Sequence, residues 1–225
     1  MKVAGVAACA LSSALVAQAL GGWEGPAKER KGLTTYSGKV QGWKKGVKTV
    51  GILGEDEGDK LVTGKIDANG NFTLNFSNDK KMLDEYALPL SLTVPYKDMC
   101  TYDVCEITIS NPEALWLKSP AFYTVTNGDH GEAFINGEEV KAPKPIDLFK
   151  IASVNHLVYA SDNVDVVGQV INKENGSTVT YDLHLPAGWS FVQEWSDRTF
   201  DAKGGIVRTE RVFRSVPPPS TAWEQ

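Results

Sequence analysis

The sequence is poor in the residues and motifs that most often carry chemistry. Its 225 residues include only three His and three Cys. It has no G-x-S-x-G elbow, H-E-x-x-H motif, P-loop or G-x-G-x-x-G loop, so the familiar signatures of hydrolases, zinc enzymes and nucleotide-binding enzymes are absent. We expect His130 in an exposed turn and His156 at a strand edge, with His184 far from both in the sequence, and we expect no cofactor.

An excess of positive charge is also lacking. The formal net charge is −5, and no long block of Lys and Arg is interleaved with aromatic residues, which argues against a nucleic-acid partner. With 42% hydrophobic and 23% charged residues, the composition is that of a globular protein. Collagen, a coiled coil and bulk disorder are excluded.

The N-terminal residues predict export. Lys2 precedes a run of small and apolar residues at 3–16, and Ala-Gln-Ala at 17–19 is a typical signal-peptidase site. We expect cleavage before Leu20 and a secreted, periplasmic or cell-envelope protein that does not span the membrane, because no other stretch approaches 18 apolar residues. A retained N-terminal anchor and lipoprotein cleavage before Cys9 are the alternatives.

Cys100 and Cys105 are the two cysteines that remain after signal cleavage. In an oxidising compartment they are expected to form a disulfide. Loop entropy gives such a small ring roughly 2 kcal/mol of stabilisation, which fixes a loop rather than a domain. A metal site is the alternative, although this spacing without a second Cys pair is weak zinc spacing.

Turn chemistry predicts several hairpins. At residues 64–76, a three-residue loop with Asp67 opening a type I turn and Gly70 in the left-handed conformation keeps the apolar side chains on one face. The pairs expected from it are Ile66 with Phe72 and Val62 with Phe76. The same turn chemistry recurs at residues 201–204 and places Phe200 beside Ile206.

Two further hairpins are predicted at Asn-Gly pairs. A two-residue type I′ turn at Asn175-Gly176 pairs Val170 with Tyr181 and Val166 with Leu185. Asn136-Gly137 indicates a hairpin between Ala133 and Val140. A short helix is expected near residues 79–86, and the stiff segment 216–219 is expected to let Trp223 pack back on the protein.

These patterns predict an all-β protein, namely an antiparallel β-sandwich followed by a second small β-rich unit. The predicted organisation is a signal peptide at 1–19, a lead-in linker at 20–32, a β-sandwich at 33–112 and a C-terminal β-rich domain at 113–225. Residues 142–145, Ala-Pro-Lys-Pro, are the competing boundary, and one large domain remains an alternative.

Residues 35–40 and 64–74 contain S-G-x-V and D-x-x-G-x-F-x-L patterns. In these motifs the chain resembles the carboxypeptidase regulatory-like, or transthyretin-like, β-sandwich family over residues 33–111. The resemblance implies a seven-stranded, non-catalytic module of the kind often attached to exported bacterial proteins. Residues 157–162 and 185–189 look like parts of small bacterial envelope proteins. The acidic insertion at 55–59 and the Cys100–Cys105 loop depart from the family pattern.

Two groups of residues are candidates for binding. Core packing is the default expectation for the tryptophans, but exposed tryptophans on a β-sandwich can stack on sugars, and the residues to test for this are Trp43, Trp189 and Trp195. An acidic run, which is most simply a solvated loop, also supplies oxygen ligands for a surface cation. Its members are Glu55, Asp56, Glu57 and Asp59.

The sequence therefore favours a non-enzymatic extracytoplasmic β-sandwich protein that serves envelope structure or partner recognition. An envelope protein or a glycan is the expected partner, and the oligomeric state stays open. One alternative is a carbohydrate-binding module that uses surface Trp. The other is an enzyme with a dispersed site, in which one of the three histidines lies beside carboxylates in a deep pocket.

Overall fold

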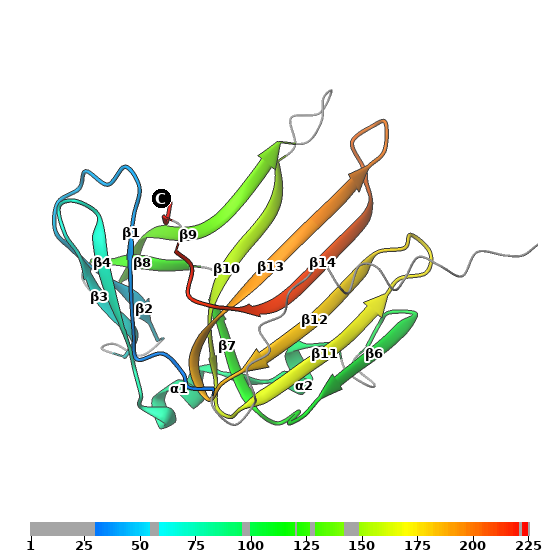
Figure 1. Ribbon diagram of the computed structural model, residues 1–225, viewed down its shortest axis with the longest axis horizontal. Coiled ribbons are helices and arrows are strands. Elements are labelled where there is room, and N and C mark those ends of the chain that lie inside the picture. The colour runs from blue at the N-terminus through cyan, green and yellow to red at the C-terminus, as the bar shows by residue number, and fades with distance from the viewer. Residues whose placement is uncertain are drawn as a thin grey trace, which may run out of the picture.

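The fold is all-β, as the sequence predicts. The computed structural model describes residues 30–54, 59–95, 100–119, 121–126, 129–141, 149–220 and 222–224. These residues form fourteen strands and two short helices (Figure 1). The predicted signal and most of the predicted lead-in lie outside the described residues. Within the described ranges, no helix is long and apolar enough to cross a membrane.

An N-terminal antiparallel sheet forms one end of the protein, at the left of Figure 1. In spatial order it consists of β1 (Thr35–Lys39), β4 (Asn71–Phe76), β3 (Lys60–Ile66), β2 (Lys48–Leu53), β8 (Ala121–Thr126) and the first part of β9 (Asp129–Lys141).

A larger sheet begins at the second part of β9. Its strands follow in the order β10 (Phe149–Ala160), β13 (Gly188–Phe200), β14 (Ile206–Val216), β12 (Thr178–Leu185), β11 (Val164–Ile171) and β6 (Val104–Ile109). β12 and β14 run parallel. The strand β7 (Leu115–Ser119) pairs with β10 and with the short β5 (Leu88–Pro89).

Strand β9 joins the two sheets because it changes partner along its length. Ile135 pairs with Ala121 of β8, whereas the next residue, Asn136, pairs with Asn155 of β10. Both asparagines are buried, and the Asn155 amide donates a hydrogen bond to the Asn136 side chain. The predicted hairpin at Asn136-Gly137 is therefore wrong, since this Asn serves a core hydrogen bond in a continuous strand.

The two Asp-Gly turns are confirmed. Ile66 pairs with Phe72 across the first turn, and Gly70 has φ +85°. Asp67 Oδ1 accepts hydrogen bonds from the backbone N–H groups of residues 69 and 71 at 2.8 and 2.9 Å. Asp201 accepts from residues 203 and 205 at 2.8 Å in the same way. The side-chain carboxylate thus holds the loop that sets the register.

The hairpin near Asn175-Gly176 has a longer loop than predicted. Val170 pairs with Val179 rather than with Tyr181, a shift of two residues that leaves the faces unchanged. Asn172 accounts for the difference. Its Oδ1 accepts from the N–H of Glu174 at 2.9 Å, and its carbonyl accepts from the N–H of Gly176 at 2.8 Å.

The predicted short helix is confirmed as α1 (Lys80–Tyr86), and Asp79 caps it by accepting from Met82 N. Tyr159 of β10 donates a 2.9 Å hydrogen bond to Asp84 and so fixes α1 on the larger sheet. A second helix, α2 (Leu90–Thr93), buries Leu90.

Two hydrophobic clusters cover opposite faces of the larger sheet, because alternate residues of each strand point to opposite sides. Leu157 and Tyr159 of β10 belong to the cluster that lies against the N-terminal sheet. Val158 and Ala160 belong to the other cluster, which includes Leu90 of α2.

The C-terminal residues bridge the two ends of the N-terminal sheet. The N–H of Trp223 donates to the carbonyl of Lys39 at the end of β1, and its carbonyl accepts from the N–H of Gln41, while Glu224 exchanges two backbone hydrogen bonds with Ile135 of β9. Trp223 is fully buried, so the prediction that it packs back on the protein is confirmed. One strip of backbone thereby links the first and last strands of this sheet.

Strand pairs join residues on both sides of the predicted boundary at residue 112. β2 pairs with β8 in the N-terminal sheet, and β6 pairs with β11 in the larger sheet. The division into units at 33–112 and 113–225 stays a prediction, as does the sandwich family.

Candidate functional site

A groove of about 520 Å³ lies between the Cys100–Cys105 loop and the hairpin formed by β13 and β14. We call it the β13–β14 groove. It is lined by charged, hydroxyl and apolar side chains, namely Tyr102, Ser177, Thr178, Val179, Glu194, Arg198, Ile206, Thr209 and Arg211.

The register of β13 and β14 brings the charged residues of the groove to one face. Ser196 pairs with Arg211, and Arg198 pairs with Thr209. Side chains two residues apart on a strand point the same way. Glu194, Arg198 and Arg211 therefore project from the same side of the larger sheet.

Glu194 is the centre of a hydrogen-bonded network. One carboxylate oxygen lies 3.0 Å from His156 Nε2 and 3.2 Å from Lys118 Nζ. The other accepts from Arg211 Nε at 3.0 Å and Nη2 at 2.5 Å. Burial favours the neutral form, but these hydrogen bonds and the charges of Lys118 and Arg211 outweigh it and hold the pKa of Glu194 well below its ordinary value.

His156 supports Glu194 from the protein interior. Its side chain is buried in the middle of β10, so the predicted position at a strand edge is wrong. Burial lowers the pKa of His156, and the hydrogen bond to Glu194 offsets this only in part. The ring is thus neutral near pH 7, with Nε2–H donating to the carboxylate, and its Nδ1 has no hydrogen-bond partner within the described ranges. It positions Glu194 and is not part of the groove lining.

Arg211 is oriented by Glu194 and by an aromatic ring. Its Nε and Nη2 atoms both contact the same carboxylate oxygen, and its guanidinium carbon lies 5.1 Å from the centre of the Phe213 ring. A guanidinium carries five N–H donors in a rigid fork. In the described part of the chain, the end of that fork formed by Nη1 and Nη2 keeps donors without a protein acceptor.

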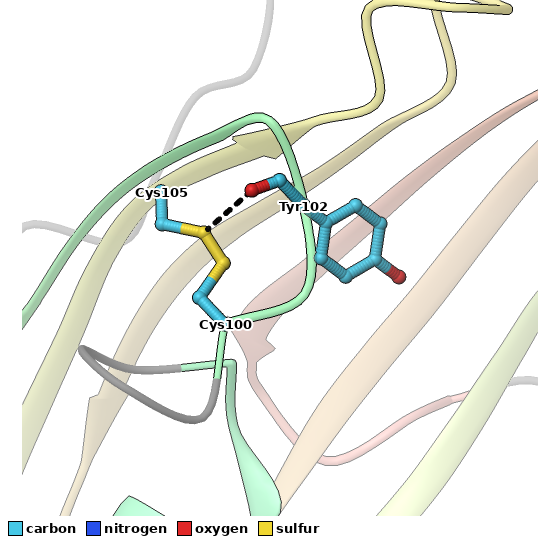
Figure 2. The surroundings of a disulfide bond; sticks show 3 residues. All are labelled: Cys100, Tyr102 and Cys105. Carbon is cyan, nitrogen blue, oxygen red and sulfur yellow. Dashed lines mark hydrogen bonds between the residues drawn. A yellow bond between two sulfur atoms is a disulfide. The ribbon is translucent and has the colours of Figure 1, made fainter.

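The Cys100–Cys105 loop forms a rim of the groove. The two Cα atoms are 6.4 Å apart, at disulfide-bonding distance, and Cys105 Sγ lies 3.7 Å from the Tyr102 carbonyl oxygen. Figure 2 shows the bond between the sulfur atoms and the Tyr102 ring directed away from it. Asp103 also accepts from the N–H of Lys173 at 2.6 Å. The disulfide and this contact hold Tyr102 beside the groove.

The candidate tryptophans do not form a shared surface. Trp43 and Trp189 are 6% and 1% exposed and belong to the hydrophobic core, so neither presents a ring face to a sugar. Trp195 is 37% exposed. It lies next to Glu194 on β13 and therefore on the opposite face from the β13–β14 groove.

The acidic candidates are described only in part. Glu55, Asp56 and Glu57 lie outside the described residues. Asp59 accepts a 2.6 Å hydrogen bond from the Tyr86 hydroxyl and so helps to anchor the end of α1. Among the described residues, no group of three His, Cys, Asp or Glu side chains is arranged to hold a metal ion.

His184 is not part of the groove lining. His184 Nδ1 is 2.7 Å from Asp165 and its Nε2 is 3.1 Å from Asp182. Asp165 also accepts from Arg30 at 2.7 Å. Through Arg30, this cluster attaches the segment before β1 to the face of the larger sheet opposite the β13–β14 groove. His130 is in β9, and its side chain lies outside the described part.

Sequence reasoning missed the residues that the structure brings together here, Lys118, Glu194, Arg198 and Arg211. The signal available for Glu194 and Arg198 is their alternation on the strand that leads into the predicted turn at 201–204. Whether Arg211 shares their face depends on a register irregularity between Thr199 and Phe200.

Comparison with known proteins returns no relative of this chain: no protein-family model, no curated protein and no solved structure matches it.

Proposed function

We propose that this chain is a non-enzymatic extracytoplasmic β-sandwich protein that recognises a partner through the β13–β14 groove. The observation that supports the proposal is the Arg211 guanidinium, which Glu194 fixes in orientation, while one end of its fork meets no acceptor among the described residues. A group held in place before binding loses little conformational entropy when the partner arrives.

Two features support a location outside the cytoplasm. Residues 1–19 have the pattern of a secretory signal, and Cys100 and Cys105 lie at disulfide-bonding distance, which is typical of oxidising compartments. The motif resemblance to carboxypeptidase regulatory-like modules agrees with a non-catalytic role.

Export is tested by expressing the chain with its own N-terminus in an exporting bacterial host and measuring the intact mass of the protein recovered outside the cytoplasm. We expect a product that begins at Leu20. A product that retains residues 1–19 would contradict cleavage, and a lipid-modified Cys9 would support the lipoprotein alternative.

Recognition is tested with the disulfide-bonded chain 20–225 against a panel of oligosaccharides and peptides, read out by the shift in thermal unfolding. We expect a ligand whose stabilising effect is lost in Arg211→Ala and kept in Trp195→Ala. The reverse pattern would support binding by a surface Trp instead. Hydrolytic turnover that disappears in His156→Gln would overturn the non-enzymatic assignment.

A further inference from the structure

We infer that the ligand of the β13–β14 groove is a carbohydrate that carries a carboxylate, bound by the free end of the Arg211 guanidinium with Arg198 beside it. The inference rests on the proposed function and adds the chemical class of the ligand.

The charge balance favours an anionic group. The groove lining holds two guanidinium groups, Arg198 and Arg211, and one carboxylate, Glu194. Lys118 contacts the same carboxylate from outside the lining. The protein as a whole has a net charge of −5, so this local positive excess runs against the overall charge. Arg198 has no ion-pair partner in the part of the chain that the structure describes. An incoming anion would complete the pairing.

The geometry of Arg211 favours an oxyanion with two oxygens. Glu194 occupies the Nε and Nη2 side of the guanidinium, so the Nη1 and Nη2 end remains for a second acceptor. That end matches the spacing of two carboxylate oxygens. Arg198 projects from the adjacent strand on the same face, because its partner Thr209 lies two residues from Arg211. One carboxylate is therefore within reach of two guanidinium groups.

The rim favours a sugar as the carrier of the carboxylate. Tyr102 is 36% exposed and offers a ring for stacking. Ser177 and Thr209 line the same groove, and hydroxyl side chains of this kind match the hydroxyl groups of a sugar. A volume of about 520 Å³ lies within the range typical of small-molecule sites.

The test uses titration calorimetry on the disulfide-bonded chain 20–225. The probes are trigalacturonate, its neutral counterpart trigalactose, and the acidic peptide triglutamate. We expect trigalacturonate to bind, with an affinity that falls as NaCl is raised, and we expect much weaker binding of the other two. Arg211→Ala is expected to reduce the affinity about 10- to 100-fold, which is the usual range for a hydrogen bond to a charged group.

Arg214→Ala is the matched control. Arg214 lies on the same strand, and its Nε and Nη2 contact Gln193 Oε1 at 2.9 and 2.5 Å, as Arg211 contacts Glu194. It points to the opposite face, so its removal should leave trigalacturonate affinity unchanged. Arg211→Lys keeps the charge without the fork and is expected to bind more weakly than wild type. Unfolding curves of each variant exclude misfolding as the cause.

The outcomes show separately whether the ligand class is wrong and whether the groove is a binding site at all. If trigalactose binds as tightly as trigalacturonate and its binding is lost in Tyr102→Ala, the requirement for a carboxylate is wrong, whereas recognition by the groove stands. If triglutamate binds as tightly as trigalacturonate, the assignment of the ligand as a carbohydrate is wrong. If none of the three probes binds, the inference fails. If binding occurs and is unchanged in Tyr102→Ala, Arg198→Ala and Arg211→Ala, the proposed function fails as well.

Discussion

The indole Nε1 of Trp223 donates a 3.1 Å hydrogen bond to the hydroxyl of Tyr36, a residue 187 positions earlier in the chain. The same hydroxyl donates a 2.6 Å hydrogen bond to the carbonyl of Pro219. Both rings belong to one aromatic group, in which Trp223 also packs against Phe72 and Phe122 with ring centres 6.1 and 4.9 Å away. The C-terminal segment is thus part of the core of the N-terminal sheet.

Trp223→Ala is expected to lower the free energy of unfolding by about 3–5 kcal/mol, the usual cost of removing a large buried aromatic side chain. Urea unfolding measured by circular dichroism checks this. Trp195→Ala serves as the control, because Trp195 is 37% exposed and should cost clearly less. Equal losses in the two variants would contradict the role assigned to the C-terminal segment.

Gly70→Ala is expected to destabilise the protein more than Gly42→Ala does. Both glycines have positive φ, +85° and +71°, which costs an alanine about 1 kcal/mol. A Cβ on Gly70 would lie 2.6 Å from the Val40 carbonyl oxygen, whereas one on Gly42 meets nothing within 4 Å. We expect losses of about 2–4 kcal/mol and 1 kcal/mol respectively. Similar denaturation midpoints for the two variants would rule out the steric explanation.

Stability is expected to fall in two steps as the pH is lowered. The folded protein keeps the pKa of His156 below the ordinary 6.5, so below about pH 6.5 the unfolded chain takes up a proton that the folded chain does not. The folded protein also keeps the pKa of Glu194 below the ordinary 4.5. Glu194 therefore stabilises the fold above about pH 4.5, and this contribution is lost as the pH falls further. Denaturation midpoints between pH 8 and pH 3 measure both steps.

His156→Gln should remove the first of these steps and leave the second. The variant is expected to be less stable than wild type at pH 7.5, because Glu194 loses a fixed donor. Its denaturation midpoint should vary less than that of wild type between pH 7.5 and pH 5.5. If the two proteins show the same slope over that interval, another group is responsible.

The double variant Cys100→Ser, Cys105→Ser is expected to unfold with a free energy lower by roughly 2 kcal/mol. Chain 20–225 should show no free thiol before reduction, and the reduced wild type should match the double variant in stability. Two titratable thiols in the native protein would show that the pair is not bonded.

Most of the hairpin predictions depended only on residues that are close together in the sequence. At Asp67 and Asp201 the turn depends on a carboxylate that accepts nearby backbone N–H groups, so a few adjacent residues determine the outcome. The Asn136 prediction failed because the partner that decides its structure, Asn155, comes from another strand. No local pattern contains that information.

The groove could not be predicted from the sequence for a similar reason, because it depends on how two strands are paired. Extending the correctly predicted pair Phe200–Ile206 without interruption places Arg211 opposite Trp195. The irregularity between Thr199 and Phe200 shifts the register by one residue, so that Arg211 lies opposite Ser196 instead. One extra residue moves a side chain to the other face. The common face of Glu194 and Arg211 is a consequence of that bulge.

The link between Trp223 and the first strands also governs the order of events during synthesis. Residues 35–76 leave the ribosome long before the segment that completes their sheet, and contacts this distant in sequence form slowly. During translation the N-terminal strands therefore lack the contacts of Trp223 and Glu224, and the finished sheet is a product of the complete chain.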